Sequence, residues 1–158
     1  MADPKAGKVQ TTTTQGALRI NEVVAENKSI IKDPQGDFDD YIEIINTSQD
    51  KIDLSNKFLT DNKKSPRKWR FPNGTHIAAG ERLIIWADEN GKAPVGLHAN
   101  FKLDKAGETI QLIDSDSAGN QILDEINYAK LGPDQAYRRV PDAKGDPSKG
   151  GPSPGKKN

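Results

Sequence analysis

The sequence predicts an all-β protein, an antiparallel sandwich, from two observations. Short runs rich in β-branched and aromatic residues recur roughly every eight to twelve residues, and clusters of Gly, Pro, Asn and Asp separate them. Apolar residues show no helical periodicity along the chain. Because the connections are short, neighbouring strands are expected to run antiparallel. The expected strands are residues 18–25, 41–46, 58–60, 68–71, 82–87, 109–113, 122–128 and 136–139.

The run at residues 41–46 shows the alternation of a strand with one buried face. Ile42 and Ile44 alternate with Tyr41, Glu43 and Ile45, so Ile45 needs a second apolar environment. We expect Glu43, like Asn46 at the strand end, to face solvent or to bond backbone groups, with a structural role favoured.

Turn residues mark the limits of the later runs. Pro72-Asn73-Gly74 is a turn signal, and Ala79-Gly80-Glu81 allows the chain to reverse before the apolar run 83–86. Trp86 and Phe101 are expected in the core, because they lie in the strongest apolar blocks and aromatic residues are few.

The chain divides into one folded centre and two polar ends. With 158 residues it has room for one domain, since domains typically span roughly 100 to 150 residues. Residues 1–16, which include a threonine tract, are expected to be disordered, and residues 17–141 to form the sandwich. Residues 142–158 are rich in Pro and Gly and are expected to form a loosely attached tail or a linker.

Composition excludes several classes of function. The 23 basic and 23 acidic residues cancel, so an electrostatic partner such as nucleic acid would require a local patch. The absence of cysteine excludes disulfides, thiolate catalysis and cysteine-based zinc sites. No run approaches the roughly 20 apolar residues of a membrane span, and the first thirty residues lack the apolar stretch of a signal peptide.

Several short sequence blocks follow one another in a characteristic order. They are Leu-Arg-Ile-Asn-Glu-Val (18–23), Asp-Phe-Asp-Asp-Tyr-Ile-Glu-Ile-Ile-Asn (37–46), Ile-Asp-Leu-Ser (52–55), Trp-Arg-Phe-Pro-Asn-Gly (69–74), Leu-Ile-Ile-Trp-Ala-Asp (83–88), Leu-His-Ala-Asn-Phe-Lys-Leu (97–103) with Gly-Glu (107–108), and Ser-Pro-Gly (153–155). In this order the blocks resemble the lamin tail domain, over about residues 17–158.

This resemblance implies an immunoglobulin-like sandwich that binds other molecules and has no catalytic residue and no cofactor. The chain has no heptad rod and is more similar to bacterial members, which occur in larger secreted or envelope-attached proteins. We therefore expect a monomeric, non-catalytic binding or localisation module outside the bacterial cytoplasm. Its expected partner is a protein, a glycan or another component of the cell envelope.

A basic loop at residues 63–70 is the main candidate for ligand binding. It places five cations around one indole, a combination that suits phosphate or a stacked ring. The candidate residues are Lys63, Lys64, Arg67, Lys68, Trp69 and Arg70. They provide an alternative function, nucleic-acid association. The favoured interpretation is a charged hairpin loop whose Trp69 turns inward.

Aspartates crowd the loop before residue 41. Asp37, Asp39 and Asp40, together with Asp33, could form a weak calcium site, although an ordinary solvated turn is favoured. Residues 114–125 match the spacing of an EF-hand loop in part, but they lie between two expected strands. A β-hairpin turn accounts for them better.

No motif indicates an enzyme. His76 and His98 lie in different segments without a nucleophile or metal motif nearby, and His98 is expected to have a packing or turn-stabilising role. Asp39 and Glu43 could in principle act as a glycosidase pair, but the sequence predicts no cleft around them.

Overall fold

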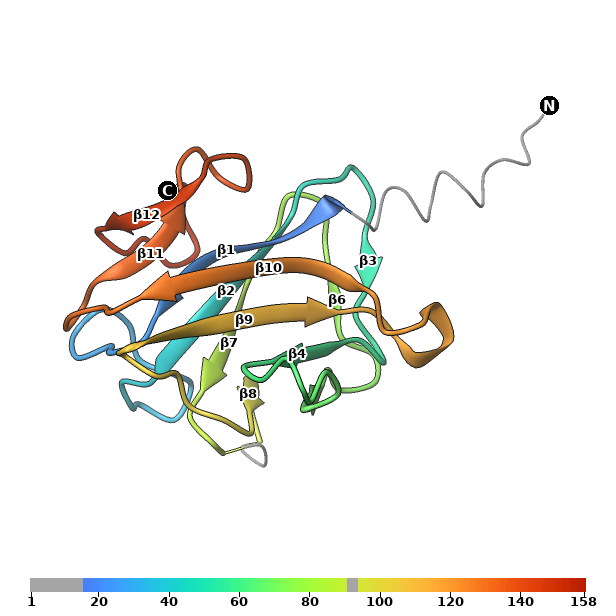
Figure 1. Cartoon of the computed structure of the whole chain (residues 1–158), viewed down its shortest axis with the longest axis horizontal. Helices are drawn as coiled ribbons and strands as arrows, with labels where there is room; N and C mark the ends of the chain where they lie inside the picture. Colours follow the sequence, from blue (N-terminus) through green and yellow to red (C-terminus); the bar gives the residue numbers. More distant parts are fainter. Residues whose placement is uncertain (1–15, 91–93) are drawn as a thin grey trace.

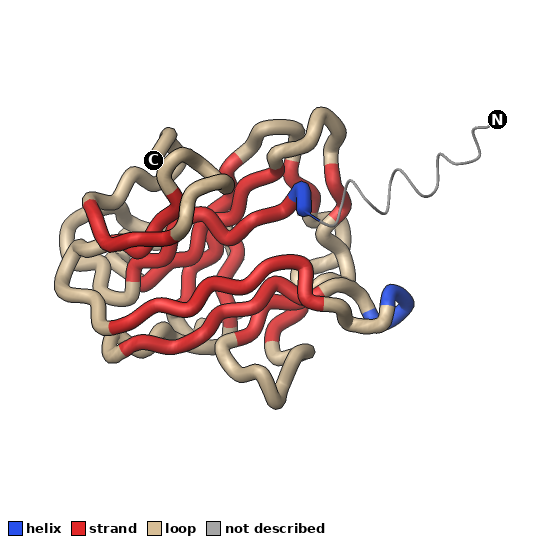
Figure 2. The backbone as a smooth tube through the Cα atoms, turned by 45° about the horizontal axis from the view of Figure 1, so that its top comes forward, coloured by secondary structure: helices blue, strands red, loops and turns tan. Residues whose placement is uncertain are grey.

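The structure is a computed structural model that describes residues 16–90 and 94–158, and it confirms the all-β sandwich (Figure 1). The segment expected to be disordered lies almost entirely outside the described residues. Figure 2 shows strands running through most of the molecule. A single turn of 3-10 helix, η1 (Asp116–Ala118), lies in the hairpin loop between two of them.

The larger sheet has six strands in the order β12-β11-β1-β2-β7-β8. Neighbours in this sheet run antiparallel, except that β8 lies parallel to β7. The bounds are β1 (Leu18–Val24), β2 (Asp40–Asn46), β7 (Arg82–Ala87), β8 (Leu97–Ala99), β11 (Ala136–Arg139) and β12 (Pro147–Gly150).

The second sheet has four antiparallel strands in the order β10-β9-β4-β5. Two further strands pair with each other separately. The bounds are β4 (Phe58–Thr60), β5 (Trp69–Arg70), β9 (Gly107–Ile113) and β10 (Ile122–Ala129) for the sheet, and β3 (Ile52–Asp53) and β6 (His76–Ile77) for the pair.

The core forms where apolar side chains of both sheets meet. Ile42 and Ile44 on β2 and Ile110 and Leu112 on β9 are fully buried in one cluster. On β10, buried Ile126 and Tyr128 alternate with exposed residues, as a strand with one solvent-facing side requires. Phe101 belongs to this cluster with 3% of its surface exposed, which confirms its expected place in the core.

A second apolar cluster contains Val24 of β1 and Tyr41 of β2, which do not belong to the main core cluster. Trp86 is buried, as expected, but it packs with Val24, Tyr41 and Ala136, and its ring centroid lies 6.0 Å from that of Tyr41. Ile30 and Ile31, from the loop after β1, pack against this cluster. The central strands of the larger sheet are therefore buried on both faces.

The C-terminal segment differs from the loose tail or linker that its composition predicts. Residues 147–150 form β12, which pairs with β11 over four residue pairs. Ser153, Gly155 and Asn158 then donate hydrogen bonds to buried or half-buried groups of β1, β2 and the 140s loop. Polar contacts, rather than apolar burial, hold this segment in place.

Candidate functional site

The basic loop connects β4 to β5, and its aromatic residue faces the interior. Trp69 has 8% of its surface exposed and packs against Phe71, with ring centroids 4.8 Å apart. The inward orientation favoured from the sequence is therefore the one observed. The indole does not present a face on which a base or a sugar could stack.

Two of the five cations in this loop are neutralised by carboxylates. The Arg67 guanidinium lies 2.9 Å from Asp116, and the Lys68 ammonium lies 2.6 Å from Asp61. Lys63 and Lys64 are exposed, and neither forms an ion pair within residues 16–90 and 94–158. The loop thus keeps only part of the positive charge that its sequence indicates.

An open pocket of about 420 Å³ lies beside this loop. Its lining comes from three separate segments: the turn before β4, the end of β5 and the β9–β10 hairpin loop. The lining residues are Ser55, Asn56, Phe58, Arg70, Ser115, Asp116 and Ser117. The hairpin loop that contributes the last three lies on the opposite side of the molecule from the C-terminus (Figures 1 and 2).

Strand pairing explains why distant segments meet in this pocket. Phe58 at the start of β4 is the register partner of Ile113 at the end of β9, so residues before 58 lie beside residues after 113. Of the lining residues, only Arg70 belongs to the binding set expected from sequence. The serines and Asn56 were missed because their proximity depends on the β4–β9 pairing. The one signal in the sequence was that polar turn residues precede the expected strand 58–60 and follow the expected strand 109–113.

The pocket lining carries one guanidinium, Arg70, and one carboxylate, Asp116, which pairs with Arg67 of the basic loop. A hydrogen bond from Asn120, followed by the bond and charge of Arg67, lowers the pKa of Asp116. Arg70 also acts on Asp116 electrostatically, and its own side chain is exposed. Nearby, Lys57 and Asp114 form an ion pair at 2.9 Å.

The hairpin loop itself is not an EF-hand. Asp114 is occupied by Lys57 and by the backbone N–H of Ser115, and Asn120 donates to Asp116. Residues 116–118 form the turn η1 between two strands, without the flanking helices that aim EF-hand ligands.

The aspartate loop is organised by hydrogen bonds to its own backbone. Asp33 is buried and accepts the N–H groups of Gln35 and Asp37, each at 2.9 Å. Asp37 is exposed, while Asp40 accepts the N–H of Leu103 at 3.2 Å. Burial raises the pKa of Asp40 to about 7, and burial, the bond shared with Asp33 and the adjacent carboxylates raise the pKa of Asp39 to about 6.

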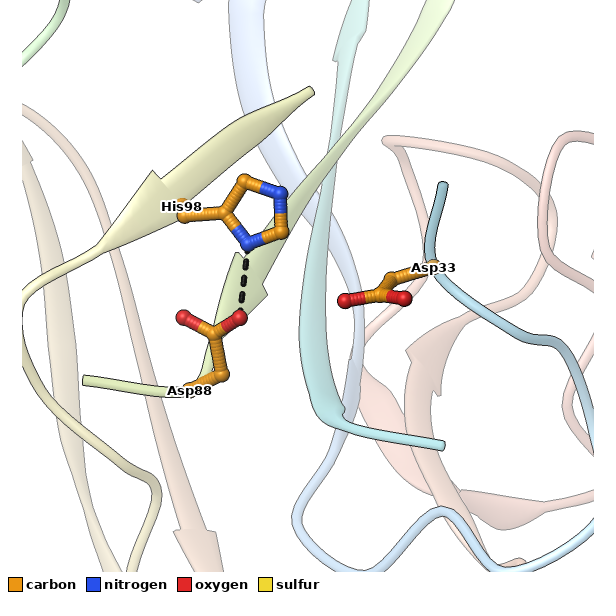
Figure 3. Close-up of side chains that lie close together, drawn as sticks. All are labelled: Asp33, Asp88 and His98. Atoms are coloured by element: carbon orange, nitrogen blue, oxygen red, sulfur yellow. Dashed lines mark hydrogen bonds and ion pairs between the residues drawn. The ribbon is translucent and has the colours of Figure 1, made fainter. Parts of the chain in front are cut away.

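A cluster of Asp33, Asp88 and His98 has the composition of a metal site (Figure 3). The potential ligand atoms lie within 4.8 Å of one another, and Asp33 faces the His98–Asp88 pair from a separate segment. His98 Nδ1 lies 2.6 Å from Asp88 Oδ2, and Nε2 lies 2.8 Å from the carbonyl oxygen of Val95.

The hydrogen bonds of His98 are those of a structural imidazolium. A carboxylate and a carbonyl are acceptors, so both ring nitrogens lie where they can donate and neither lone pair is directed at a metal position. Burial opposes the charged ring, but the bonds to Asp88 and Val95 prevail, so the pKa of His98 is raised. The ring therefore fastens the β7–β8 connection, consistent with the turn-stabilising role expected from sequence.

The lamin tail domain family profile matches residues 11–130. The chain belongs to the lamin tail domain family. A search of curated proteins found no match. Among the residues that the structure describes, no helix has the length and apolar character needed to cross a bilayer.

This lamin tail domain buries two glutamates beneath its C-terminal segment. The segment follows residue 130, where the family match ends. Glu22 accepts the Tyr41 hydroxyl at 2.5 Å and the N–H of Ser153 at 3.1 Å. Glu43 accepts the side-chain amide of Asn21 at 3.1 Å and the N–H of Gly155 at 2.7 Å. Because Glu43 is fully buried and bonded in this way, it does not form a solvent-facing acid–base pair with Asp39.

Proposed function

We propose that this lamin tail domain is a non-catalytic binding or localisation module of a larger bacterial protein that is secreted or attached to the cell envelope. It acts as a monomer and contacts a protein or glycan partner. Lamin tail domains are immunoglobulin-like interaction domains, and the chain shares their fold and sequence profile. Family membership thus supports a binding role, and the open pocket beside the basic loop is the surface that we propose for it.

The observation that carries the proposal is the contrast between buried and exposed polar groups. The buried carboxylates Glu22 and Glu43 and the buried His98 are each held by several hydrogen bonds within the fold. Arg70 and the serine hydroxyls instead line an open pocket between loops. Loops on a rigid β scaffold are the usual location of binding residues in such folds.

The proposal is tested by screening the full chain against arrayed glycans and envelope proteins. The same screen is run with an Arg70→Gln and Ser117→Ala double variant and with Lys64→Gln as the matched control. We expect at least one partner to bind the wild type and the control but not the double variant. If no partner of either class binds, or if every partner binds all three proteins equally, the pocket is not the binding surface.

A second candidate function, nucleic-acid association, is supported by the exposed Lys63 and Lys64. With Arg70 they provide three cations outside ion pairs in the described chain, which gives a log–log salt slope of about −3 on B-DNA. The buried Trp69 argues against stacking on a base. A fluorescence titration of a labelled duplex at low salt tests this, and absence of binding there would end this alternative.

A further inference from the structure

We infer that the pocket beside the basic loop binds an anionic saccharide, a hydroxyl-bearing sugar with a carboxylate or sulfate that pairs with Arg70. This inference rests on the proposed binding function and specifies the class of partner for the same site. Two features of the pocket carry it: the chemistry of its lining and its balance of charge. The buried indole of Trp69 argues against a nucleic acid, which would stack its bases.

The lining suits hydroxyl groups rather than apolar groups. Ser55, Ser115 and Ser117 contribute hydroxyls, Asn56 an amide and Asp116 a carboxylate, while Phe58 is the one apolar side chain in this set. Among the residues that the structure describes, no aliphatic side chain lines the pocket, so neither a lipid chain nor an apolar peptide side chain would gain much burial there. The volume of about 420 Å³ lies in the lower part of the range of small-ligand sites, roughly 300 to 1,000 Å³.

The hydroxyls keep hydrogen-bonding capacity for a ligand. Ser115 and Ser117 bond each other at 3.1 Å, which uses one of their two hydroxyl hydrogens and leaves the other free to donate. Ser55 accepts the N–H of Gly74 at 2.7 Å and serves mainly to shape the rim. Ring hydroxyls of a sugar both donate and accept, and the mixed donors and acceptors of this pocket match that requirement.

The charge balance favours a negative substituent on the sugar. Arg67 is committed to Asp116 in an ion pair at 2.9 Å, so these two charges compensate each other. Lys57 and Asp114 compensate each other in the same way. Arg70 remains as an exposed guanidinium in the wall of the pocket, and its planar fork of donors matches a carboxylate or a sulfate.

The arrangement favours a saccharide over a nucleic acid. Lys63 and Lys64 do not line the pocket, and the indole of Trp69 is buried. Phe58 has 3% of its surface exposed, and the Arg67 guanidinium lies 5.5 Å from its ring centroid. A ligand in the pocket is therefore held by polar groups at its edges rather than by stacked bases.

Amide shift mapping of the full chain tests this inference with defined probes. The probes are a trisaccharide of galacturonic acid, its methyl ester, which keeps the ring but removes the charge, and a sulfated trisaccharide. We expect the acid or the sulfated probe to shift the amides of Ser55, Asn56 and Ser115–Ser117, and the ester to bind more weakly. Comparing acid with sulfate identifies which anion the pocket prefers.

Three variants assign the contacts. Arg70→Gln should weaken binding of the anionic probe roughly ten- to hundredfold, because a hydrogen bond to a charged group contributes about 1.5 to 3 kcal/mol. Ser117→Ala should weaken it less, and Lys64→Gln should leave it unchanged. Retained near-ultraviolet circular dichroism of each variant shows that its fold is intact.

Two kinds of result would overturn the inference. One is loss of the charge dependence: the ester binds as tightly as the better of the two anionic probes, or Arg70→Gln binds that anionic probe as tightly as wild type does. The other is a set of shifts confined to Lys63 and Lys64 that Lys64→Gln abolishes, which would place anion binding on the basic loop. If these probes fail while another glycan or a protein binds in the array screen, the inference fails and the proposed function stands; if nothing binds in either experiment, both fail.

Discussion

Replacing Glu43 with glutamine should change how the stability of the domain depends on pH. Burial raises the pKa of Glu43 to about 7, against the hydrogen bonds from Gly155 and Asn21, which lower it. The ordinary value is 4.5, so the folded state holds this proton more tightly than the unfolded state does. The resulting stabilisation is fully present below pH 4.5 and is lost as the pH rises to about 7.

The size of the effect follows from the two pKa values. The free energy of unfolding changes by about 1.36 kcal/mol for each pH unit between 4.5 and about 7, so ionisation of Glu43 lowers it by about 3 kcal/mol over that interval. Glutamine has the same shape and no charge, so Glu43→Gln removes this dependence. The substitution also turns an amide N–H₂ toward either the side-chain amide of Asn21 or the N–H of Gly155, so that two donors face each other. This costs about 1 to 3 kcal/mol and does not vary with pH.

Urea unfolding of both proteins at a series of pH values from 4.5 to 8 measures this difference. We expect the variant to be less stable than the wild type at pH 4.5 and to gain about 3 kcal/mol relative to it by pH 8. The exposed Glu89→Gln is the control and should show no such trend. A stability difference between Glu43→Gln and wild type that stays constant with pH would show that the pKa of Glu43 is not raised in the folded state.

Three further predictions concern the main core, the buried Arg139 between the two sheets and the aspartate loop. Phe101→Ala should cost roughly 3 to 5 kcal/mol in urea unfolding, because Phe101 is 3% exposed in the main core, and a loss below about 1 kcal/mol would contradict that position. Arg139→Met should cost about 3 to 5 kcal/mol by the same assay, because it breaks the buried ion pair with Asp124 at 3.5 Å. It also removes the donors to the carbonyls of Ile20 and Glu125, whereas the exposed Lys149→Met should cost little. Adding Ca²⁺ to about 10 mM should leave the amide signals of residues 36–40 in place, because the carboxylates of Asp33 and Asp40 already accept hydrogen bonds from backbone N–H groups. Signals that shift in the wild type but not in Asp37→Asn would instead demonstrate a calcium site in this loop.

The fold was accessible from sequence where one buried face imposes an alternating pattern. The strands at residues 58–60, 82–87 and 136–139 have the expected bounds, and β2 begins one residue earlier than expected, at Asp40. Trp86 shows the limit of this reasoning. Its burial was predicted, but its separate cluster depends on the loop after β1 folding over the outer face of the sheet, which no strand pattern encodes.

The remaining elements are short or lack an apolar pattern. β12 contains Pro147 and Gly150, and it forms because β11 offers a free edge and because Ser153 and Gly155 supply donors to buried carboxylates. Beside the parallel β7–β8 pair, His98 bonds Asp88 and Val95, contacts between residues 3 to 10 positions apart that no apolar pattern predicts. Composition therefore indicated a loose tail, whereas hydrogen bonds to residues distant in the sequence hold the C-terminal segment in place.

The candidate site was predicted only in part for a similar reason. Arg70 belongs to a conspicuous run of cations, so its type and position drew attention. Its neutralised neighbours, Arg67 and Lys68, could not be distinguished from it, because Asp116 and Asp61 meet them only in the folded chain. The serine hydroxyls of the pocket carried no motif of their own.

A crystal structure of the domain soaked with the galacturonic acid trisaccharide tests directly whether the pocket binds an anionic saccharide. We expect density for the sugar between Arg70 and Ser117, with its carboxylate on the guanidinium and its hydroxyls toward the serines and Asn56. Density for the sugar at another surface, or an empty pocket in crystals whose neighbouring molecules leave it open, would show that this pocket is not the saccharide site.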